Sequence, residues 1–288
     1  MKSLSKNQLK ALAAYRIQKR CDEEGLFVVE GVKMCGEALA SDFTIRAVCA
    51  TADYLASLPE LGSEVYEVSP EQLERLSCMR TPNKVWMLVE RKTESGKRKA
   101  ESIPGEVGMN PQDPQDLASK ASRRNPQDLQ DLASNASRST SGGQLTLALD
   151  GLQDPGNMGT IMRTADWYGI RHIVCSRDTV SCYNPKVVQS TMGAIFRTRV
   201  EYVDLAEWLE AAAARGTATY GALLDGEPYS KTTLQRPAVL VVGNEGKGIS
   251  PRVAAAVQKR LTIPNIGGTC ESLNAAVATA ILCSEFYR

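Results

Sequence analysis

Apolar residues along this chain occur either in short continuous runs or in stripes at helical spacing. The runs are typical of buried strands and the stripes of helices with one buried face. The first stripe, over 7–20, predicts a helix with a basic outer face. Strands alternating with helices then predict a small α/β sandwich of about ninety residues. The expected elements that follow are strands 25–31, 43–50, 64–68 and 85–90, and helices 32–40 and 70–77.

The second half of the chain repeats the strand–helix alternation over short connections, which predicts a mostly parallel sheet covered on both faces. Ligands of such sheets bind outside the carboxyl ends of the strands. The loops that leave those ends are therefore where functional residues are expected. The expected strands are 145–150, 170–175, 196–203, 217–224, 238–243 and 260–263, and the expected helices are 159–168, 184–192, 204–215, 250–259 and a last one from about Ser272.

Between these halves, 92–143 lacks apolar periodicity and contains a near-repeat, with 110–123 recurring as 125–138. Two short polar copies are too few to stack as a solenoid. Such a composition cannot bury enough apolar surface to offset its ordering entropy. We therefore expect a disordered linker over 92–143, between an N-terminal domain at 1–91 and a second domain at 144–288.

Composition narrows the functional classes. Apolar residues make up 43% of the chain and charged residues 23%, as in a soluble globular protein. The net charge is only +1, so a basic surface that could bind nucleic acid must be confined to one part of the molecule. The eight cysteines form no CxxC pair, and the chain contains a single histidine, His172. We therefore expect reduced cysteines in the core and no metal site. His172 itself is expected to be a packed or capping residue. The absence of a signal peptide and of a long apolar run predicts a cytoplasmic protein without membrane spans.

Three loops at strand ends carry unusual residues. The first, 150–159, contains Pro155-Gly156, and Asn157 before the expected helix, where an asparagine is most often a cap. Arg163 follows in that helix among apolar neighbours, where a guanidinium needs an anionic or oxygen partner.

The second loop follows a strand that ends in three valines and one leucine, 239–242. It begins Gly243-Asn244-Glu245-Gly246, with Gly248 following. The glycines let a ligand approach the backbone closely. A carboxylate at the centre disfavours a phosphate cradle, and the phosphate-loop and dinucleotide patterns are both missing. Glu245 is better suited to a cationic ligand or an arginine partner.

The third loop follows Ile263-Pro264 and leads to Ser272-Leu273-Asn274 at the start of a helix rich in small residues. A strand, a glycine-containing loop and a helix N-terminus together direct backbone N–H groups at a ligand.

In this order and spacing, the three stretches N157-M-G-T-I-M-R-T-A165, L240-V-V-G-N-E-G-K-G248 and I263-P…E271-S-L-N-A-A-V-A278 resemble the three motifs of the SpoU/TrmH branch of the SPOUT RNA methyltransferases. The resemblance spans 145–288. The leading part, with F27-V-V-E-G31 after the basic helix, resembles that family's N-terminal RNA-binding domain.

The resemblance implies a C-terminal parallel-sheet domain tied in a trefoil knot, with a small α/β RNA-binding domain before it. It implies methyl transfer from S-adenosylmethionine to a ribose 2′-oxygen of structured tRNA or ribosomal RNA, by a homodimer. A guanidinium keeps its proton at neutral pH, so Arg163 is expected to position the hydroxyl and stabilise the alkoxide. Four further side chains are expected to orient Arg163, the cofactor and the nucleotide: Asn157, Glu245, Ser272 and Asn274. The residues expected at the cofactor are Gly243, Asn244, Glu245, Gly246, Ile263, Leu273 and Asn274.

The third loop departs from the family pattern. The segment N265-I-G-G-T-C-E271 is one residue longer than usual, and Asn265 replaces an apolar residue after the proline. Two other functions stay open: a non-catalytic RNA-binding or assembly protein that keeps the knot, and a nucleotide-binding α/β protein, which the missing phosphate loops disfavour. The tryptophans Trp167 and Trp208 are expected in a core or an interface.

Overall fold

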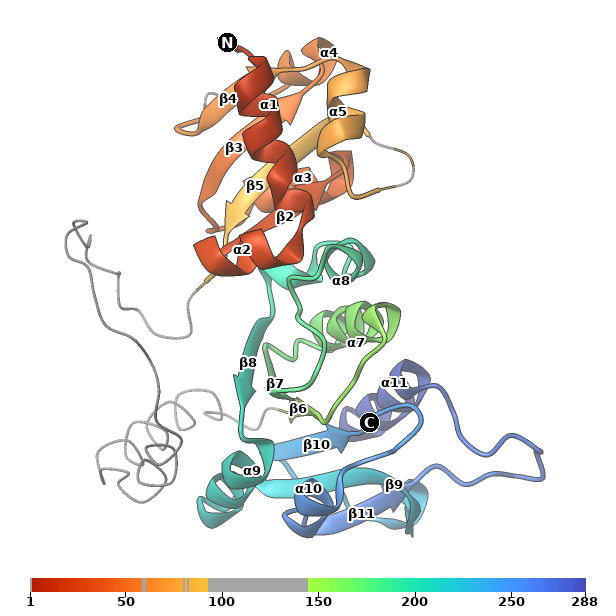
Figure 1. Cartoon of the computed structure of the whole chain (residues 1–288). Coiled ribbons are helices and arrows are strands. Elements are labelled where there is room, and N and C mark those ends of the chain that lie inside the picture. The colour runs from red at the N-terminus through yellow and green to blue at the C-terminus, as the bar shows by residue number, and fades with distance from the viewer. Residues whose placement is uncertain (1, 59–60, 80, 82, 93–144) are drawn as a thin grey trace, which may run out of the picture.

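The computed structural model describes residues 2–58, 61–79, 81, 83–92 and 145–288, and it contains two β-sheets, one on either side of the gap at 93–144 (Figure 1). The predicted linker therefore lies almost wholly outside the described residues. Within the described ranges, no helix is both long and apolar enough to cross a membrane.

The N-terminal sheet has five strands in the order β1-β4-β3-β5-β2. The pairings of β4 with β1 and with β3 are parallel, whereas β5 runs antiparallel to both β3 and β2. Along β2, Phe27 and Val29 face one core and Leu26 and Val28 face another, so the strand is apolar on both faces up to Glu30. The strands are β1 (Lys2–Ser3), β2 (Leu26–Glu30), β3 (Ile45–Ala50), β4 (Glu64–Glu67) and β5 (Val85–Glu90).

The predicted helix over 7–20 is wrong, because the chain breaks at Ile17, which has an extended backbone and is 64% exposed. Leu9 and Cys21 both lie in the core between this segment and the sheet. In one straight helix, twelve residues of separation would turn these two side chains about 120° apart. The helical elements here are α1 (Lys6–Ala13), η1 (Ala14–Arg16), α2 (Gln18–Glu24), α3 (Val32–Leu39), α4 (Ala52–Leu55) and α5 (Pro70–Leu76).

The C-terminal sheet confirms the predicted parallel arrangement. Its six strands follow the order β11-β9-β10-β6-β7-β8, and every neighbouring pair is parallel. All six strands therefore have their carboxyl ends at one edge of the sheet. They are β6 (Leu145–Leu149), β7 (His172–Ser176), β8 (Arg199–Val203), β9 (Ala218–Pro228), β10 (Ala238–Val242) and β11 (Lys259–Thr262).

Helices cover both faces of this sheet, and the strands alternate between the two cores. Leu147 and Leu149 pack with α7, α8 and α11, whereas Ala148 packs with α9 and α10. The helices are α7 (Pro155–Trp167), α8 (Pro185–Ser190), α9 (Leu205–Ala214), α10 (Pro251–Ala255) and α11 (Ala275–Phe286), with short 3-10 turns η4 (Ala194–Phe196) and η5 (Tyr229–Lys231).

Several helices begin or end at other residues than the sequence predicts. α10 ends at Ala255 rather than at 259, because Gln258 pairs with Thr219 on β9 through two hydrogen bonds of 3.1 and 3.0 Å. α11 begins at Ala275, with Asn274 as its cap, and leaves Ser272 in the preceding loop. Long-range partners thus decide where these helices stop and start.

The two sheets are joined by shared packing. The ring of Phe27 on β2 lies 4.8 Å from that of Tyr183, and the ring of Phe43 lies 5.3 Å from that of Phe196. Arg197 pairs with Glu37 on α3 and, at 2.9 Å, with Asp166 on α7. One apolar core therefore runs from the N-terminal sheet into the C-terminal one.

Candidate functional site

Side chains from the three predicted loops meet at the carboxyl edge of the parallel sheet. Asn157 donates from Nδ2 to Oε1 of Glu245 at 2.8 Å. Its Oδ1 accepts a hydrogen bond of 2.9 Å from Nδ2 of Asn274. These links join residues 88 and 117 positions apart in the chain. The structure therefore brings one side chain from each of the three loops together.

The first loop places Asn157 inside helix α7 rather than before it. Asp154 is the cap, its Oδ1 accepts from the backbone N–H of Asn157 at 2.7 Å, and Pro155 occupies the first helical position. The prediction that Asn157 precedes the helix as a possible cap is therefore wrong. Because Asp154 takes over the capping, the amide of Asn157 is left to join Glu245 and Asn274. The pair Asp154-Pro155 was the signal in the sequence, since aspartate favours the cap and proline the first turn.

The second loop is a tight backbone turn that only glycine allows at its first position. A Cβ on Gly243 would lie 2.2 Å from the carbonyl carbon of Gly248 and 2.3 Å from the backbone nitrogen of Ile249. Asn244 and Gly248 exchange two backbone hydrogen bonds of 2.9 Å across the turn. The close approach fixes where Glu245 and Gly246 stand at the tip.

Asn244 shapes this turn with its own side chain. Its Oδ1 accepts from the N–H groups of Gly246 and Lys247 at 2.9 and 3.0 Å, and its Nδ2 donates to the carbonyl of Gly151 at 2.8 Å. Asp150, a site residue that was not predicted, accepts from the N–H of Ser250 at 2.6 Å. The sequence offered one signal for it, a carboxylate directly after a buried strand.

Arg163 stands apart from this cluster. It lies six residues beyond Asn157 on α7, which corresponds to about 9 Å along the axis and a different side of the helix. Its side chain is exposed and has no ion pair or hydrogen bond with any described residue. Glu245 likewise has no cationic partner among the residues that the structure describes. The structure does not bring Arg163 and Glu245 together.

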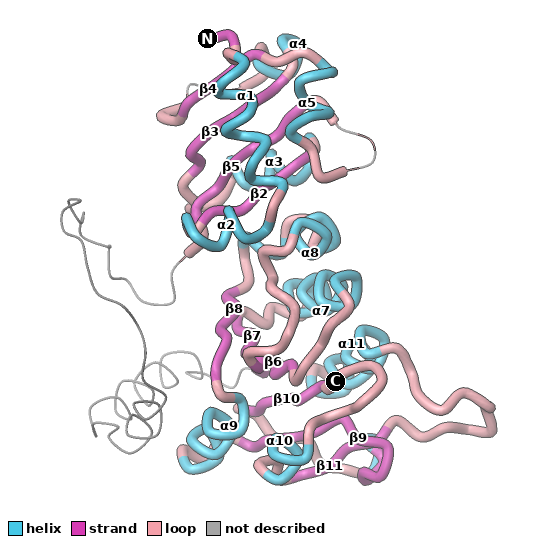
Figure 2. Tube along the Cα trace, viewed as in Figure 1, coloured by secondary structure: helices cyan, strands magenta, loops and turns pink. Residues whose placement is uncertain are grey.

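The third loop stands away from the body of the domain (Figure 2). Ile263 is half-buried, while 264–274 is exposed throughout. Asn265 stabilises the local turn, because its Oδ1 accepts from Gly268 at 2.7 Å and its Nδ2 donates to the carbonyls of Gly268 and Cys270. Of the expected loop residues, Asn274 reaches the site, whereas Ser272 makes no hydrogen bond within the described ranges and Leu273 is 49% exposed.

The predicted role of His172 as a packed residue is confirmed. It is buried, its Nε2 lies 2.7 Å from Oε2 of Glu201, and its ring meets that of Trp208 edge-on at 6.2 Å. Trp208 is buried, as expected, but Trp167 is 86% exposed and belongs to none of the apolar cores formed by the described residues. Among the residues described here, no cluster of three or more His, Cys, Asp or Glu could hold a metal ion.

Comparisons with known proteins agree with this arrangement. Residues 144–284 match the SpoU rRNA Methylase family, and residues 6–86 match the MRM3-like substrate binding domain. A solved TrmH-family structure from Porphyromonas gingivalis shares 36% sequence identity and superposes with a TM-score of 0.76 over 99% of this chain and 98% of that one. The chain belongs to the SpoU/TrmH family.

Two further relatives are informative for this SpoU/TrmH chain. An AdoMet-bound rRNA methyltransferase from Sinorhizobium meliloti is 25% identical, with a TM-score of 0.76 over 99% of this chain and 96% of that one. The 23S rRNA (guanosine(2553)-2′-O)-methyltransferase RlmP of Bacillus subtilis is 38% identical over 137 residues, 47% of this chain and 55% of its own length. The chain spans about half the length of the curated relatives it matches.

Proposed function

We propose that this protein transfers a methyl group from S-adenosylmethionine to a ribose 2′-hydroxyl of structured tRNA or ribosomal RNA. The observation that carries the proposal is the chain of hydrogen bonds from Glu245 through Asn157 to Asn274. It gathers one residue from each motif of a SpoU/TrmH chain at the sheet edge where ligands of parallel sheets bind.

The loops at this edge suit S-adenosylmethionine, which when bound supplies an electrophilic methyl group on a positively charged sulfonium. The turn at Gly243 packs directly against the backbone of Gly248 and Ile249, which fixes the loop whose exposed tip offers its backbone groups to an adenosine. The carboxylate of Glu245 is exposed and has no cation of its own in the described chain, so it is available to a positive ligand. We assign the cofactor to the turn 243–246, with Ile263, Leu273 and Asn274 on its other side.

Positioning supplies most of the rate in such a transfer, because the 2′-oxygen must meet the methyl carbon in line. The amide of Asn157 has both ends engaged, so its orientation is set before the substrate arrives. Arg163 holds the 2′-hydroxyl and the neighbouring phosphate and stabilises the negative charge that develops on the oxygen. The proton of the hydroxyl leaves to solvent. Ser272 joins this set when the exposed loop packs against the substrate.

We propose further that the enzyme works as a homodimer with the trefoil knot of its family, in the cytoplasm with its RNA, and that it divides into domains at 1–91 and 144–288. Along α7, Thr160, Arg163 and Trp167 form an exposed stripe at helical spacing. Helix α11 packs beside α7 and exposes Val277, and the rings of Tyr168 and Tyr287 stack at 5.3 Å between them; exposed apolar side chains on paired helices favour a partner. A dimer interface over this stripe would bring Arg163 close to the second subunit.

The dimer is tested by Trp167→Glu, which we expect to convert the protein to a monomer in light scattering coupled to gel filtration. A charge placed at a buried aromatic contact costs several kcal/mol (about 2–4). The control is Leu224→Glu on β9, also a large exposed apolar residue at 74%, which should leave the dimer intact. A wild-type monomer at micromolar concentration would contradict the dimer.

The side chain of Asn274 has two roles, as the cap of α11 and as the link to Asn157, and different substitutions can separate them. Its Oδ1 accepts from the N–H groups of Ala276 and Val277, while its Nδ2 reaches Asn157. We expect Asn274→Ala to lose about 1 kcal/mol of unfolding free energy and about tenfold in kcat/KM. Asn274→Ser keeps a capping oxygen, so it should lose the same activity with near wild-type stability. Urea unfolding and methyl-transfer kinetics measure both, and a fully active serine variant would remove the link from the mechanism.

The activity is tested by mapping ribose methylation of total tRNA and rRNA by mass spectrometry, with and without the gene. We expect one 2′-O-methylated position to disappear and to return when the purified protein and S-adenosylmethionine are added to the unmodified RNA. The competing function is a non-catalytic RNA-binding or assembly protein. It predicts no lost methylation and no calorimetric binding of the cofactor at millimolar concentration.

A further inference from the structure

A cleft of about 510 Å³ lies between the two sheets and has no part in the methyl-transfer chemistry described above. Its volume is in the range of small-molecule sites. One wall comes from β2 and the segment between α5 and β5, and the other comes from α8 and the first turn of α7. The lining includes Glu30 and Cys78 on the N-terminal side, and Asp154, Gly156 and Lys186 on the C-terminal side.

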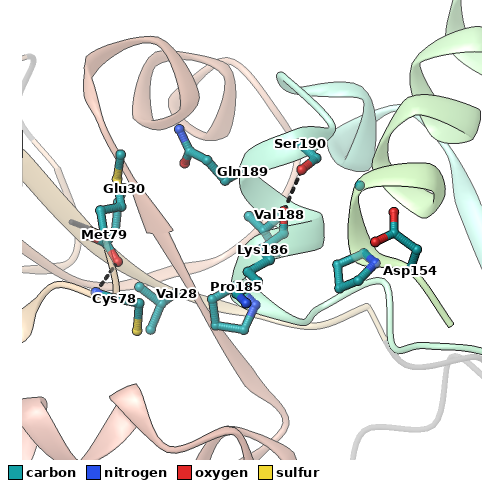
Figure 3. A pocket seen from close by; sticks show the side chains of 12 residues that line it. Val28, Glu30, Cys78, Met79, Asp154, Pro185, Lys186, Val188, Gln189 and Ser190 are labelled. Atoms are coloured by element: carbon teal, nitrogen blue, oxygen red, sulfur yellow. Dashed lines mark hydrogen bonds between the residues drawn. The ribbon is translucent and has the colours of Figure 1, made fainter. Parts of the chain in front are cut away.

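The cleft runs toward the site. Figure 3 shows Lys186 and Pro185 of α8 between Glu30 at one end and Asp154 at the other. Gly156, at the Asp154 end, is the residue directly before Asn157. A nucleotide in this cleft would therefore lie near Asn157, at the edge of the proposed methyl-transfer site.

Glu30 is the distinctive group. It is 6% exposed, yet no cation contacts it at ion-pair distance within the described chain. One carboxylate oxygen accepts from the N–H of Cys78 at 2.8 Å, and the other accepts from the hydroxyl of Ser77. Burial raises the pKa of the Glu30 carboxyl, although these two hydrogen bonds and, more weakly, the charge of Arg16 act in the opposite direction. Each oxygen has a second lone pair for a ligand.

The chemistry of the walls selects the ligand. An ionised carboxylate accepts well from two parallel N–H donors, and such charge-assisted pairs are the strong ones. Guanine offers two adjacent donors, N1–H and N2–H, on its Watson–Crick edge. Adenine, cytosine and uracil each set a ring nitrogen or carbonyl acceptor beside their donor, which a carboxylate repels. The exposed Lys186 in the middle of the cleft suits a phosphate.

We propose that this cleft binds one unstacked guanine nucleotide of the RNA, adjacent to the methylated ribose, with Glu30 on the base and Lys186 on the phosphate. Unpaired RNA bases are commonly read in this way, through hydrogen bonds to the Watson–Crick edge. The wall that carries Glu30 lies within the residues that match a substrate-binding domain, and the wall that carries Lys186 lies within the methylase match. The inference rests on the proposed RNA substrate, but its test does not require methyl transfer.

The test is ligand-detected NMR titration of the full-length protein with GMP, IMP and AMP. IMP keeps N1–H but lacks the N2 amino group. We expect wild type to prefer GMP over AMP by roughly fivefold or more, the range of a good bidentate contact, with IMP between them. Glu30→Gln should erase that order, because its NH₂ group faces the base donors. Lys186→Ala should weaken all three nucleotides equally.

The matched control is Glu23→Gln on α2, an exposed glutamate outside the cleft that should keep the wild-type order. Circular dichroism checks the fold of Glu30→Gln, and if that variant is unfolded, the wild-type ranking and Lys186→Ala still decide. Equal binding of GMP and AMP by wild type would overturn the inference, as would a preference that survives in folded Glu30→Gln. If the GMP preference holds while RNA methylation is absent, the methyltransferase proposal fails and the cleft assignment stands.

Discussion

Arg163→Ala should reduce methyl transfer by at least about 100-fold while cofactor affinity stays within a few-fold. Removing one group that stabilises an oxyanion costs on the order of 10²–10³ in rate. The arginine is exposed and unpaired within the described chain, so its loss should change the unfolding free energy by no more than about 0.5 kcal/mol. Single-turnover transfer to the target RNA and calorimetry with S-adenosylmethionine measure the two effects separately.

Two further variants sharpen this test. Arg163→Lys keeps the charge but not the planar pair of donors, so it should recover only part of the rate. Arg252→Ala removes another exposed arginine of the same domain, one that pairs with Asp204 at 2.8 Å on the far side of the sheet. It should retain wild-type transfer, since surface ion pairs contribute about 0–1 kcal/mol. Wild-type turnover of Arg163→Ala would remove Arg163 from the mechanism.

Gly243→Ala should abolish cofactor binding and destabilise the protein by about 1–3 kcal/mol or more. The added methyl group would lie 2.2 Å from the carbonyl carbon of Gly248, and both neighbours are backbone atoms that cannot rotate away. The turn must therefore open, which breaks the backbone pair between Asn244 and Gly248 and displaces Glu245. Calorimetry with the cofactor and urea unfolding report the two losses.

The control for this variant is Gly36→Ala. Gly36 lies within α3, and a Cβ built there meets no atom within 4 Å. An alanine in an exposed helical position should stabilise by about 0.5–1 kcal/mol and leave cofactor binding unchanged. If Gly243→Ala binds S-adenosylmethionine like wild type, the turn does not form the cofactor site.

The location of the site could be predicted from the sequence because the three loops that form it each follow a strand. Apolar runs marked β6 and β10, and the strand–helix alternation marked β11. Parallel strands end at one edge, so the loops after these three strands had to lie near one another. Which residues of the loops contact one another could not be predicted from the sequence. Ser272 was expected beside Asn274, but α11 begins after both, and only Asn274 reaches Asn157.

The cleft shows the same limit in the N-terminal half. The sequence placed Glu30 inside the predicted strand 25–31 and in the stretch F27-V-V-E-G31, but it gave this carboxylate no role of its own. Its burial arises from Ser77 and Cys78, which lie 47 and 48 residues further along the chain. Its position beside Lys186 depends on how the two sheets pack. No local pattern encodes either contact.

The sequence by itself determined the order of strands and helices, the parallel second sheet and the three loops at its edge. It could do so because the spacing of apolar residues records which face of each element is buried. Tertiary structure decided where helices begin and end, which loop residues touch, and that Arg163 stands apart from Asn157. Those outcomes depend on competition between partners distant in the chain, as where Asp154 takes the cap and leaves the amide of Asn157 to Glu245 and Asn274.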